Sequence, residues 1–164
     1  MIKVVFVCLG NICRSPAAEG ILMKIIEDNN LQDEIIVDSA GILDYHEGDY
    51  ADSRMIAAAK KRGINLITLS RPFKQKDFLE FDYIITMDNY IRDSLIGMDK
   101  GGKFNNKIYN MPWFCKEHDI QEVPDPYYGT EKDFNYVLDI LEDACKNLFI
   151  ILKKDLKKKN ETNS

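Results

Sequence analysis

The sequence predicts an α/β fold in which helices cover both faces of a parallel sheet. Short apolar runs rich in β-branched residues alternate with helical patterns along the chain, and this alternation is typical of parallel strands that are buried on both faces. The first apolar run also leads through a glycine-containing loop directly into a helix. At 164 residues, with 45% hydrophobic and 30% charged residues, the chain is long enough for one globular domain with its own core.

The chain opens with a strand, a tight loop and a helix. Ile2 to Val7 is an apolar run of strand length. Pro16 suits the first position of a helix, where its missing N–H has no partner to lose. The helix then carries one apolar stripe, formed by Ala17, Ala18, Ile21, Leu22, Ile25 and Ile26.

Strand and helix patterns continue to alternate through the middle of the chain. Gly63 marks the end of one of these helices, because glycine is the favoured residue directly after a helix. The predicted strands are Ile35 to Asp38, Tyr83 to Met87 and, more weakly, Lys107 to Met111, and the predicted helices are Asp52 to Arg62 and Asn89 to Ile96.

The last helix has the clearest pattern. From about Glu131 onward, apolar residues recur at helical spacing, namely Phe134, Val137, Leu138, Leu141, Cys145, Leu148 and Leu152. From Lys153 the sequence becomes basic and then polar, which is typical of a solvated, frayed helix end; a weak contact with an anionic partner is the alternative. We expect a single domain at residues 1–157 and a polar C-terminal tail at residues 158–164.

Composition argues against several classes of partner and cofactor. The 22 basic and 27 acidic side chains give a net charge of −5, which argues against general binding of nucleic acid. No apolar run reaches the roughly 20 residues of a membrane span, and no signal-peptide pattern opens the chain, so we expect a cytoplasmic protein without membrane contact. The four cysteines are expected to be reduced thiols. Since the two histidines and scattered cysteines lack metal-ligand spacing, no metal or other cofactor is predicted.

The chemistry is expected in the loop CLGNICRS, which runs from Cys8 to Ser15. A loop between a strand and a helix can direct several backbone N–H groups, with the positive end of the helix dipole, at one anion. Gly10 and Asn11 suit the left-handed backbone that such a loop needs. The same field favours the thiolate form of Cys8, which is a nucleophile toward phosphate esters. Arg14 supplies a planar fork for two phosphoryl oxygens.

The spacing of Cys8 and Arg14 is weak evidence when taken alone. About one arbitrary chain in ten of this length would contain it. Its position between a strand and a helix, with Gly10 inside the loop and Ser15-Pro16 behind it, makes the pattern far more specific. The structural alternative is a buried Cys8 with an Arg14 that only caps a helix or pairs at the surface.

The stretch CLGNICRSP, from Cys8 to Pro16, resembles the phosphate-binding signature of the low-molecular-weight protein tyrosine phosphatases. Further similar stretches occur in the family's order across nearly the whole chain. They are Asp38-Ser39-Ala40-Gly41, Tyr45-His46, Asp52 with Arg54, Asp82-Tyr83-Ile84, Met87-Asp88 and Asp125-Pro126-Tyr127-Tyr128. The resemblance implies a three-layer α/β/α fold with a four-stranded parallel sheet and flanking helices.

The resemblance also implies a two-step, metal-free hydrolysis of phosphotyrosine and of small aryl phosphates. Cys8 would attack phosphorus and become a phosphocysteine, while Asp125 would protonate the leaving phenol and then help to activate water. By the same analogy, Ser15 hydrogen-bonds the Cys8 sulfur and Asn11 holds the shape of the loop. The expected phosphate-binding residues are Leu9, Gly10, Asn11, Ile12, Cys13, Arg14 and Ser15.

Asp125 is also supported by the residues around it. Pro126 drives the Asp125 backbone toward an extended conformation, and Pro124 stiffens the segment before it. The carboxyl group therefore sits on a rigid loop, which suits a general acid. The alternative is an ordinary proline turn with a solvated carboxylate, and it would be preferred if Cys8 and Arg14 were absent.

The expected substrate pocket has aromatic and apolar walls. Tyr45, Tyr127 and Tyr128, with Leu9 and Ile12, would admit an aromatic ring above the phosphate. Buried core tyrosines are the alternative, above all for Tyr128. In the related protein-arginine phosphatases a small polar residue takes the place of Ile12, so Ile12 favours phosphotyrosine over phosphoarginine.

Cys13 is a candidate redox partner of Cys8, five positions earlier in the same loop. A reversible disulfide between them, as family members form, would protect Cys8 from irreversible oxidation. A spectator thiol is the alternative, because pair geometry cannot be read from spacing. Cys115 and Cys145 are expected to be structural.

The sequence departs from the family pattern in two places. Arg62 and Thr68 stand where some members carry histidines, one of which supports the loop asparagine and serine, so Thr68 or another donor is expected to support Asn11. The segment from Gly97 to Glu122 is distinctive and is a candidate for determining substrate choice.

Two rival functions share parts of this pattern. An arsenate reductase of the same fold would need two further cysteines near the third strand, and Ile84 to Ile96 contains none. A phosphotyrosine-binding module with little turnover would be expected to lack Cys8 or Asp125. We therefore expect a monomeric protein-tyrosine phosphatase whose partners are phosphotyrosine-containing proteins and inorganic phosphate or similar oxyanions.

Overall fold

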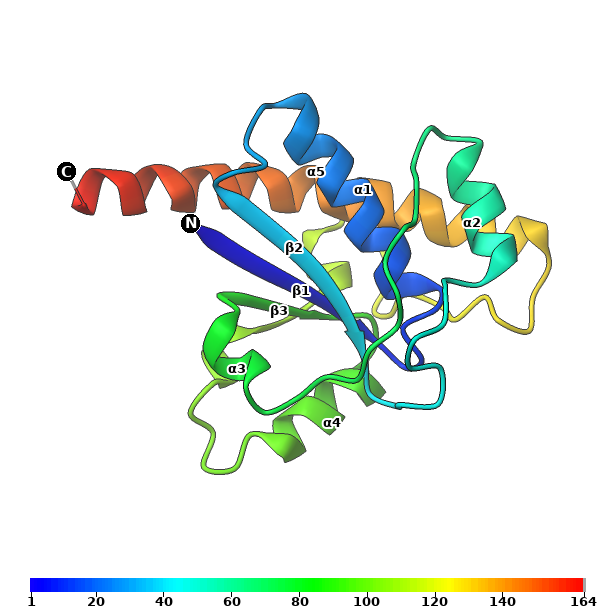
Figure 1. Ribbon diagram of the computed structural model, residues 1–164, viewed down its shortest axis with the longest axis horizontal. Helices are drawn as coiled ribbons and strands as arrows, with labels where there is room; N and C mark the ends of the chain where they lie inside the picture. Colours follow the sequence, from blue (N-terminus) through cyan, green and yellow to red (C-terminus); the bar gives the residue numbers. More distant parts are fainter. Residues whose placement is uncertain (164) are drawn as a thin grey trace.

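The computed structural model describes residues 1–163 and contains a parallel sheet of four strands between two layers of helices (Figure 1). Each neighbouring pair of strands is parallel. The predicted three-layer α/β/α architecture is therefore confirmed. In the spatial order of the sheet, the strands are β2 (Ile35–Gly41), β1 (Ile2–Cys8), β3 (Tyr83–Thr86) and β4 (Ile108–Asn110).

Five α-helices flank the sheet in the described part of the chain (Figure 1). Three of them share one hydrophobic core with the first face of the sheet, and the other two pack on the second face. The helices of the first face are α1 (Arg14–Asp28), α2 (Ser53–Lys60) and α5 (Glu131–Thr162), and those of the second face are α3 (Asp77–Glu80) and α4 (Asn89–Met98).

β1 lies inside the sheet because its residues are apolar on both faces. Val4 and Phe6 belong to the core beneath α1 and α5. Val5 and Val7 belong to the core beneath α3 and α4. None of these four side chains has exposed surface, as expected for successive residues of a strand that point to opposite, covered faces.

Several element boundaries differ from the sequence-based expectation. α1 begins at Arg14, so Pro16 is the third helical residue and not the first; it still lies in the first turn, where backbone N–H groups have no helical partner. β2 extends to Gly41 and not only to Asp38. The helix predicted to end at Arg62 ends at Lys60, and Gly63 follows with a φ of 76°.

Three short elements were not predicted. α3 and the 3₁₀ helices η1 (Asn105–Lys107) and η2 (Met111–Phe114) each span only three or four residues. A helical period cannot be recognised over so few positions. They contribute core residues all the same, because Phe78 of α3 and Met111 of η2 are fully buried.

Helix α5 continues to Thr162 and projects beyond the sheet (Figure 1). The expected start of a polar tail at residue 158 thus falls inside the helix, and Ser164 lies outside the described residues. Leu156 explains the added length, since it continues the apolar stripe and is 5% exposed. No helix within residues 1–163 is long and apolar enough to cross a lipid bilayer.

The carboxyl edge of the sheet brings distant segments together. Cys8, the last residue of β1, is paired in register with Gly41, the last residue of β2. A Cβ atom at Gly41 would lie only 2.9 Å from the carbonyl oxygen of Leu9 and 3.0 Å from the backbone nitrogen of Asn11. The absence of a side chain at Gly41 therefore lets the end of β2 pack directly against the loop that follows Cys8.

Candidate active site

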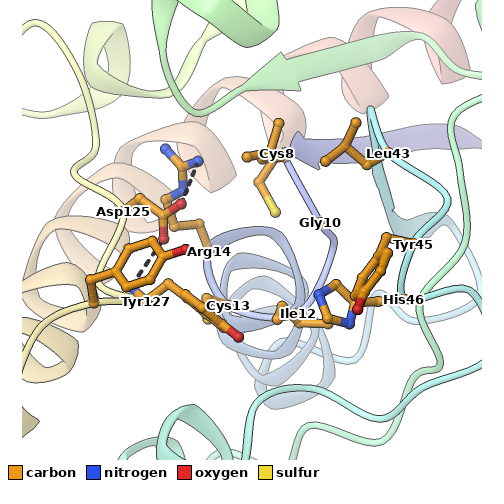
Figure 2. Close-up of a pocket in the computed structure, with 12 residues that line it drawn as sticks. Cys8, Gly10, Ile12, Cys13, Arg14, Leu43, Tyr45, His46, Asp125 and Tyr127 are labelled. Atoms are coloured by element: carbon orange, nitrogen blue, oxygen red, sulfur yellow. Dashed lines mark hydrogen bonds and ion pairs between the residues drawn. The ribbon is translucent and has the colours of Figure 1, made fainter.

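A cavity of about 260 Å³ opens at the carboxyl edge of the sheet, directly beyond β1. Figure 2 shows Cys8 with Asp125 and Tyr127 on one side of the opening and Tyr45 and His46 on the other. Three segments that are far apart in the sequence thus surround one sulfur atom. The lining residues are Cys8, Leu9, Gly10, Ile12, Cys13, Arg14, Leu43, Tyr45, His46, Asp125, Tyr127 and Tyr128.

The loop after β1 turns at Asn11, whose φ is 56°. The prediction of a left-handed backbone is confirmed for Asn11. It is wrong for Gly10, which is not among the glycines with positive φ. Gly10 instead allows a close approach, because a Cβ atom there would lie 3.2 Å from Cδ2 of His46. The glycine therefore makes room for the imidazole ring at the wall of the cavity.

A chain of hydrogen bonds leads through Asn11 to the sulfur of Cys8. The backbone N–H of Arg71 donates to Oδ1 of Asn11 (3.0 Å), which fixes the orientation of the amide. Nδ2 of Asn11 then donates to Oγ of Ser15 (2.8 Å), and Ser15 Oγ lies 2.9 Å from Cys8 Sγ. The single proton of the Ser15 hydroxyl faces both Cys8 Sγ and the carbonyl oxygen of Ala40 (3.4 Å), so the hydroxyl can donate to the sulfur when Cys8 is a thiolate.

Of the two sources of support expected for Asn11, Thr68 or another donor, the structure shows another donor. Oγ1 of Thr68 donates to Glu19 instead (3.1 Å), and the backbone of Arg71 takes the supporting role. The side chains of Asn11 and Ser15, two residues of the predicted phosphate-binding loop, are buried behind the cavity and do not line it. Their contacts support the sulfur and the loop.

Arg14 lies almost completely buried beside the cavity, with 3% of its side chain exposed. Its Nη1 donates to Oδ2 of Asp88 (2.7 Å) and to the carbonyl oxygen of Val123 (2.9 Å), while Nη2 lies 3.7 Å from Oδ2 of Asp125. Burial opposes the charge, but interactions with Cys8, Asp88 and Asp125 outweigh it and raise the pKa of Arg14. The guanidinium is therefore a fixed positive charge, and the alternative of a surface Arg14 is excluded.

Asp88 was quoted in the family resemblance but was not predicted to be a site residue. It is the N-cap of α4, where its Oδ1 accepts from the N–H of Ile91 (2.9 Å) and its Oδ2 accepts from Arg14. An aspartate directly before a helical pattern is a recognisable capping signal. The additional contact with Arg14 could not be seen, because 74 positions separate the two residues.

Asp125 lies at the rim of the cavity with 43% of its side chain exposed. Its Oδ1 accepts from the backbone N–H of Tyr127 (3.1 Å), which holds the carboxyl group in a turn. Its other oxygen faces Arg14. The carboxyl group is thus fixed by its own loop and is also accessible to solvent.

The three predicted pocket tyrosines line the cavity, and none is a core residue. Tyr45 is 83% exposed, Tyr128 is 96% exposed and Tyr127 is 38% exposed. The rings of Tyr127 and Tyr128 pack edge to face at 4.9 Å. Arg54 donates to the carbonyl oxygen of Tyr127 (2.9 Å) and lies over its ring. Leu43 and His46 also line the cavity, and they were not predicted from the sequence.

The four cysteines are unpaired thiols. Burial raises the pKa of Cys13, and the charges of Asp52 and Cys8 raise it further. Cys145 is fully buried and donates weakly to the carbonyl oxygen of Ala18, which agrees with a structural role. Cys115 is half-buried, and its thiol faces the carbonyl oxygen of Ile140.

Two further predictions concern the segment from Gly97 to Glu122 and the lack of a metal site. The segment from Gly97 to Glu122 contributes no residue to the lining of the cavity within the described chain. Residues 1–163 also contain no cluster of three or more histidine, cysteine, aspartate or glutamate side chains that could hold a metal ion.

A parallel α/β sheet with this loop and cavity at its carboxyl edge is the arrangement of a protein-tyrosine phosphatase or of an arsenate reductase of the same fold. The comparison with known proteins narrows this class to one family. The family model described as low molecular weight phosphotyrosine protein phosphatase matches residues 3–161. The chain belongs to this family.

Individual relatives cover almost the whole chain. A Synechocystis protein with a low molecular weight protein-tyrosine-phosphatase name is 44% identical over 154 residues, which are 94% of this chain and 98% of the relative. A Bacillus subtilis protein of the same description is 36% identical over 156 residues, with the same two coverages. The crystal structure of a protein tyrosine phosphatase from Entamoeba histolytica superimposes with a TM-score of 0.91, at 49% identity, over 94% of this chain and 99% of that chain. The predicted family, fold and enzyme class are confirmed.

Proposed function

We propose that this enzyme hydrolyses phosphotyrosine in proteins through a phosphocysteine formed on Cys8. The observation that carries the proposal is the convergence of three groups on one cavity. Cys8 lies at the end of β1 with a serine hydroxyl on its sulfur, Arg14 is buried beside it, and Asp125 faces Arg14 at 3.7 Å. A nucleophile, a fixed positive charge and an acid are the groups that phosphoryl transfer needs.

In the first step, Cys8 Sγ attacks phosphorus as the bond from phosphorus to the tyrosine oxygen breaks. Asp125 donates its proton to that oxygen, so that a neutral phenol leaves. Nη1 of Arg14 is already bonded to Asp88 and Val123, so Nε and Nη2 are the donors free to follow the phosphoryl oxygens. Asp88 thus acts as a positioning residue for this fork.

In the second step, water attacks the phosphocysteine and the bond from sulfur to phosphorus breaks. Asp125, now a carboxylate, takes the proton from the water and returns to its starting form. The leaving sulfur regains negative charge, and the Ser15 hydroxyl stabilises it through the hydrogen bond to Cys8. Inorganic phosphate is released, and the enzyme is regenerated without a redox change or a metal ion.

The residues from Leu9 to Ser15 are proposed to hold the phosphoryl group between the end of β1 and the start of α1. Tyr45 and Tyr127 then flank the ring of the substrate, and Ile12 supplies an apolar wall beneath it. An apolar side chain at position 12 has no hydrogen bond to offer a guanidinium. This supports an aryl phosphate over a phosphoarginine as substrate.

The proposed cellular role is that of a monomeric cytoplasmic enzyme acting on phosphotyrosine-containing proteins, with inorganic phosphate and similar oxyanions as ligands of the loop. Cys13 is proposed as the redox partner of Cys8, because both line the same cavity and the charge of Cys8 acts on Cys13. Its raised pKa keeps Cys13 in the thiol form, so attack on an oxidised Cys8 requires loss of that proton.

Hydrolysis of an aryl phosphate by the wild type, Cys8→Ser and Asp125→Ala tests the mechanism. We expect no turnover with Cys8→Ser and a kcat lowered by about 10²-fold or more with Asp125→Ala, with or without a metal chelator. Trapping of radiolabelled phosphate on Cys8 in a rapid acid quench would identify the intermediate directly.

The other outcomes separate the alternatives. Turnover that survives Cys8→Ser, or that a chelator abolishes, would disprove the thiol mechanism. Binding of a phosphotyrosine peptide without release of phosphate would instead indicate a binding module.

A further inference from the structure

The exposed side of α5 beyond Lys146 has an unusual composition. Between Lys146 and Asn160 it presents five lysines and two isoleucines but no exposed carboxylate. Asp155, the acidic residue of this stretch, is half-buried and accepts a hydrogen bond from Tyr83. We call this surface the lysine face, and its members are Lys146, Ile150, Ile151, Lys153, Lys154, Lys157 and Lys158.

The lysine face carries a local excess of positive charge. None of its five lysines forms an ion pair in residues 1–163, whereas the neighbouring Lys159 pairs with Asp82 (3.4 Å). Lys153 instead lies over the ring of Phe149, 5.6 Å from its centre. Five positive charges therefore stand together on a chain whose net charge is −5, and the acidic side chains beside them are Glu34 and Glu161, which line a hollow with Lys153 and Lys157.

Apolar side chains lie between these lysines. Ile150 is 45% exposed and Ile151 is 42% exposed. A shallow hollow next to Ile150 has Ile25 of α1 and Phe149 on its wall, with Lys146 and two further lysines around it. The face is thus both basic and apolar, along one side of a single helix.

The position of the lysine face keeps it away from the cavity. The C-terminal end of α5 lies near the start of β1, whereas Cys8 lies at the opposite end of that strand (Figure 1). The last turns of α5 also project past the sheet. A flat partner could therefore contact the lysine face while the cavity remains open to a substrate.

We propose that the lysine face docks this enzyme on an anionic phospholipid surface. Lysine ammonium groups would meet lipid phosphates and carboxylates, while their alkyl stems and the two isoleucines would enter the boundary with the acyl chains. A projecting helix edge can lie along a plane, which favours a membrane surface over a single acidic protein segment. The earlier expectation of no membrane contact depended on the lack of a span or a leader, and peripheral docking needs neither.

Sedimentation of the full chain with vesicles tests the proposal. Vesicles of phosphatidylcholine mixed with phosphatidylserine should bind the protein, and vesicles of phosphatidylcholine alone should not. Each lysine near an anionic surface strengthens binding by about fivefold, so the change of all five lysines of the face to glutamine should abolish sedimentation. Raised salt should also release the protein, because it screens exposed charges.

Two further variants make the test specific. The matched control changes five other exposed lysines to glutamine, with the same loss of charge, and should bind like the wild type; these are Lys60, Lys74, Lys76, Lys100 and Lys103. The double variant Ile150→Gln with Ile151→Gln keeps every charge and should still weaken binding. Hydrolysis of a soluble aryl phosphate should be unchanged in all variants, which separates this proposal from the catalytic one.

Three results would overturn the proposal. The first is equal sedimentation with neutral and anionic vesicles, and the second is equal loss of binding in the lysine-face variant and its control. The third is binding to soluble polyglutamate without binding to vesicles, which would assign the lysine face to an acidic protein segment.

Discussion

Asn11 supports the site although its side chain does not line the cavity. Its backbone has a left-handed φ of 56°, which asparagine tolerates better than most residues. Its amide accepts from Arg71 on one side and donates to Ser15 on the other. Both the carbonyl and the NH₂ group are therefore needed, and asparagine is the small residue that offers both.

Asn11→Asp should lower kcat/KM for an aryl phosphate by about tenfold or more, because the carboxylate cannot donate to Ser15 and adds negative charge behind the anion site. The fold should be retained, since aspartate also tolerates this backbone. Steady-state kinetics and circular dichroism would check both points.

Asn30→Asp is the matched control for this prediction. Asn30 also has a left-handed φ, of 57°, but it lies in the loop after α1 and not in the loop that contains Asn11. It should leave kcat/KM unchanged. An equal loss of activity in both variants would mean that the hydrogen bond to Ser15 has no catalytic effect.

The local residues of the site could be predicted from sequence, and its distant supports could not. Cys8, Arg14 and the loop between them form one contiguous stretch that carries its own spacing and turn chemistry. The partners that orient them come from other segments: Asp88 is 74 positions from Arg14, and Arg71 is 60 positions from Asn11. Contacts of this range depend on the packing of the sheet, which a single sequence does not reveal.

The elements around the loop hold it by close packing as well as by hydrogen bonds. β2 ends at Gly41, and its backbone meets the loop with no room for a side chain. Gly97 of α4 contrasts with it, because a Cβ atom there would have no neighbour within 4 Å. The two glycines therefore allow a paired test of what the contact contributes.

Gly41→Ala should lower the free energy of unfolding by about 1–3 kcal/mol, because the methyl group would meet backbone atoms that cannot move aside. It should also lower kcat/KM by displacing the loop. Gly97→Ala should raise stability by about 0.5–1 kcal/mol, as expected for glycine to alanine in a helix. Urea denaturation of both variants would measure these changes. Equal free energies of unfolding in the two variants would show that the close contact at Gly41 contributes nothing to stability.

The contact between α1 and β2 contains a buried carboxyl group. Glu19 of α1 is 2% exposed and accepts hydrogen bonds from Ser39 of β2 and from Thr68. Burial raises the pKa of Glu19 from 4.5 to about 7, against the lowering effect of the Ser39 hydrogen bond. The folded protein therefore binds this proton more tightly than the unfolded chain does.

Glu19→Gln should make the protein less sensitive to pH. In the wild type, the stabilisation from the raised pKa is fully present below pH 4.5 and is lost as the pH rises through about 7. The loss amounts to about 3 kcal/mol when complete. Glutamine keeps the acceptor for Ser39 and Thr68 without titrating, so the variant should be the more stable form at pH 8.

Urea denaturation at several pH values between 4.5 and 8 measures this effect. Glu27→Gln is a suitable control, because Glu27 lies on the same helix and is exposed. It should leave the pH dependence of unfolding unchanged. A wild-type stability that does not fall between pH 5 and pH 8 would contradict the interpretation.

At the scale of the whole molecule, the alternation of apolar runs and helical patterns was sufficient to predict the fold class. The positions of β1 and of the start of α5 were predicted well, because each element has many apolar residues that recur at one regular spacing. The strand order could not be read from the sequence, because it depends on which strand edges pair. The helical end of α5 was missed although Leu156 carried the signal, since the lysines around it were interpreted as a frayed end.

An oxyanion should stabilise the whole fold, because the loop proposed to bind it holds β1, α1 and the segment before α5 together. Inorganic phosphate at 100 times its dissociation constant should add about 2.7 kcal/mol to the free energy of unfolding. Thermal unfolding with increasing phosphate would measure this as a rise in Tm. Arg14→Ala should abolish most of the rise, and an equal rise in this variant would place phosphate elsewhere.

The spread of the site along the chain has a consequence for protein synthesis. Arg14 reaches its native partners only when Asp88 and Val123 exist, 74 and 109 positions later. A nascent chain therefore displays its thiol early, but it has no partner for its arginine and lacks Asp125, the proposed general acid, until most of the polypeptide has left the ribosome. Because these partners lie so far along the chain, recovery of hydrolysis in a translation or refolding experiment marks the completed chain and not the folding of its first motif.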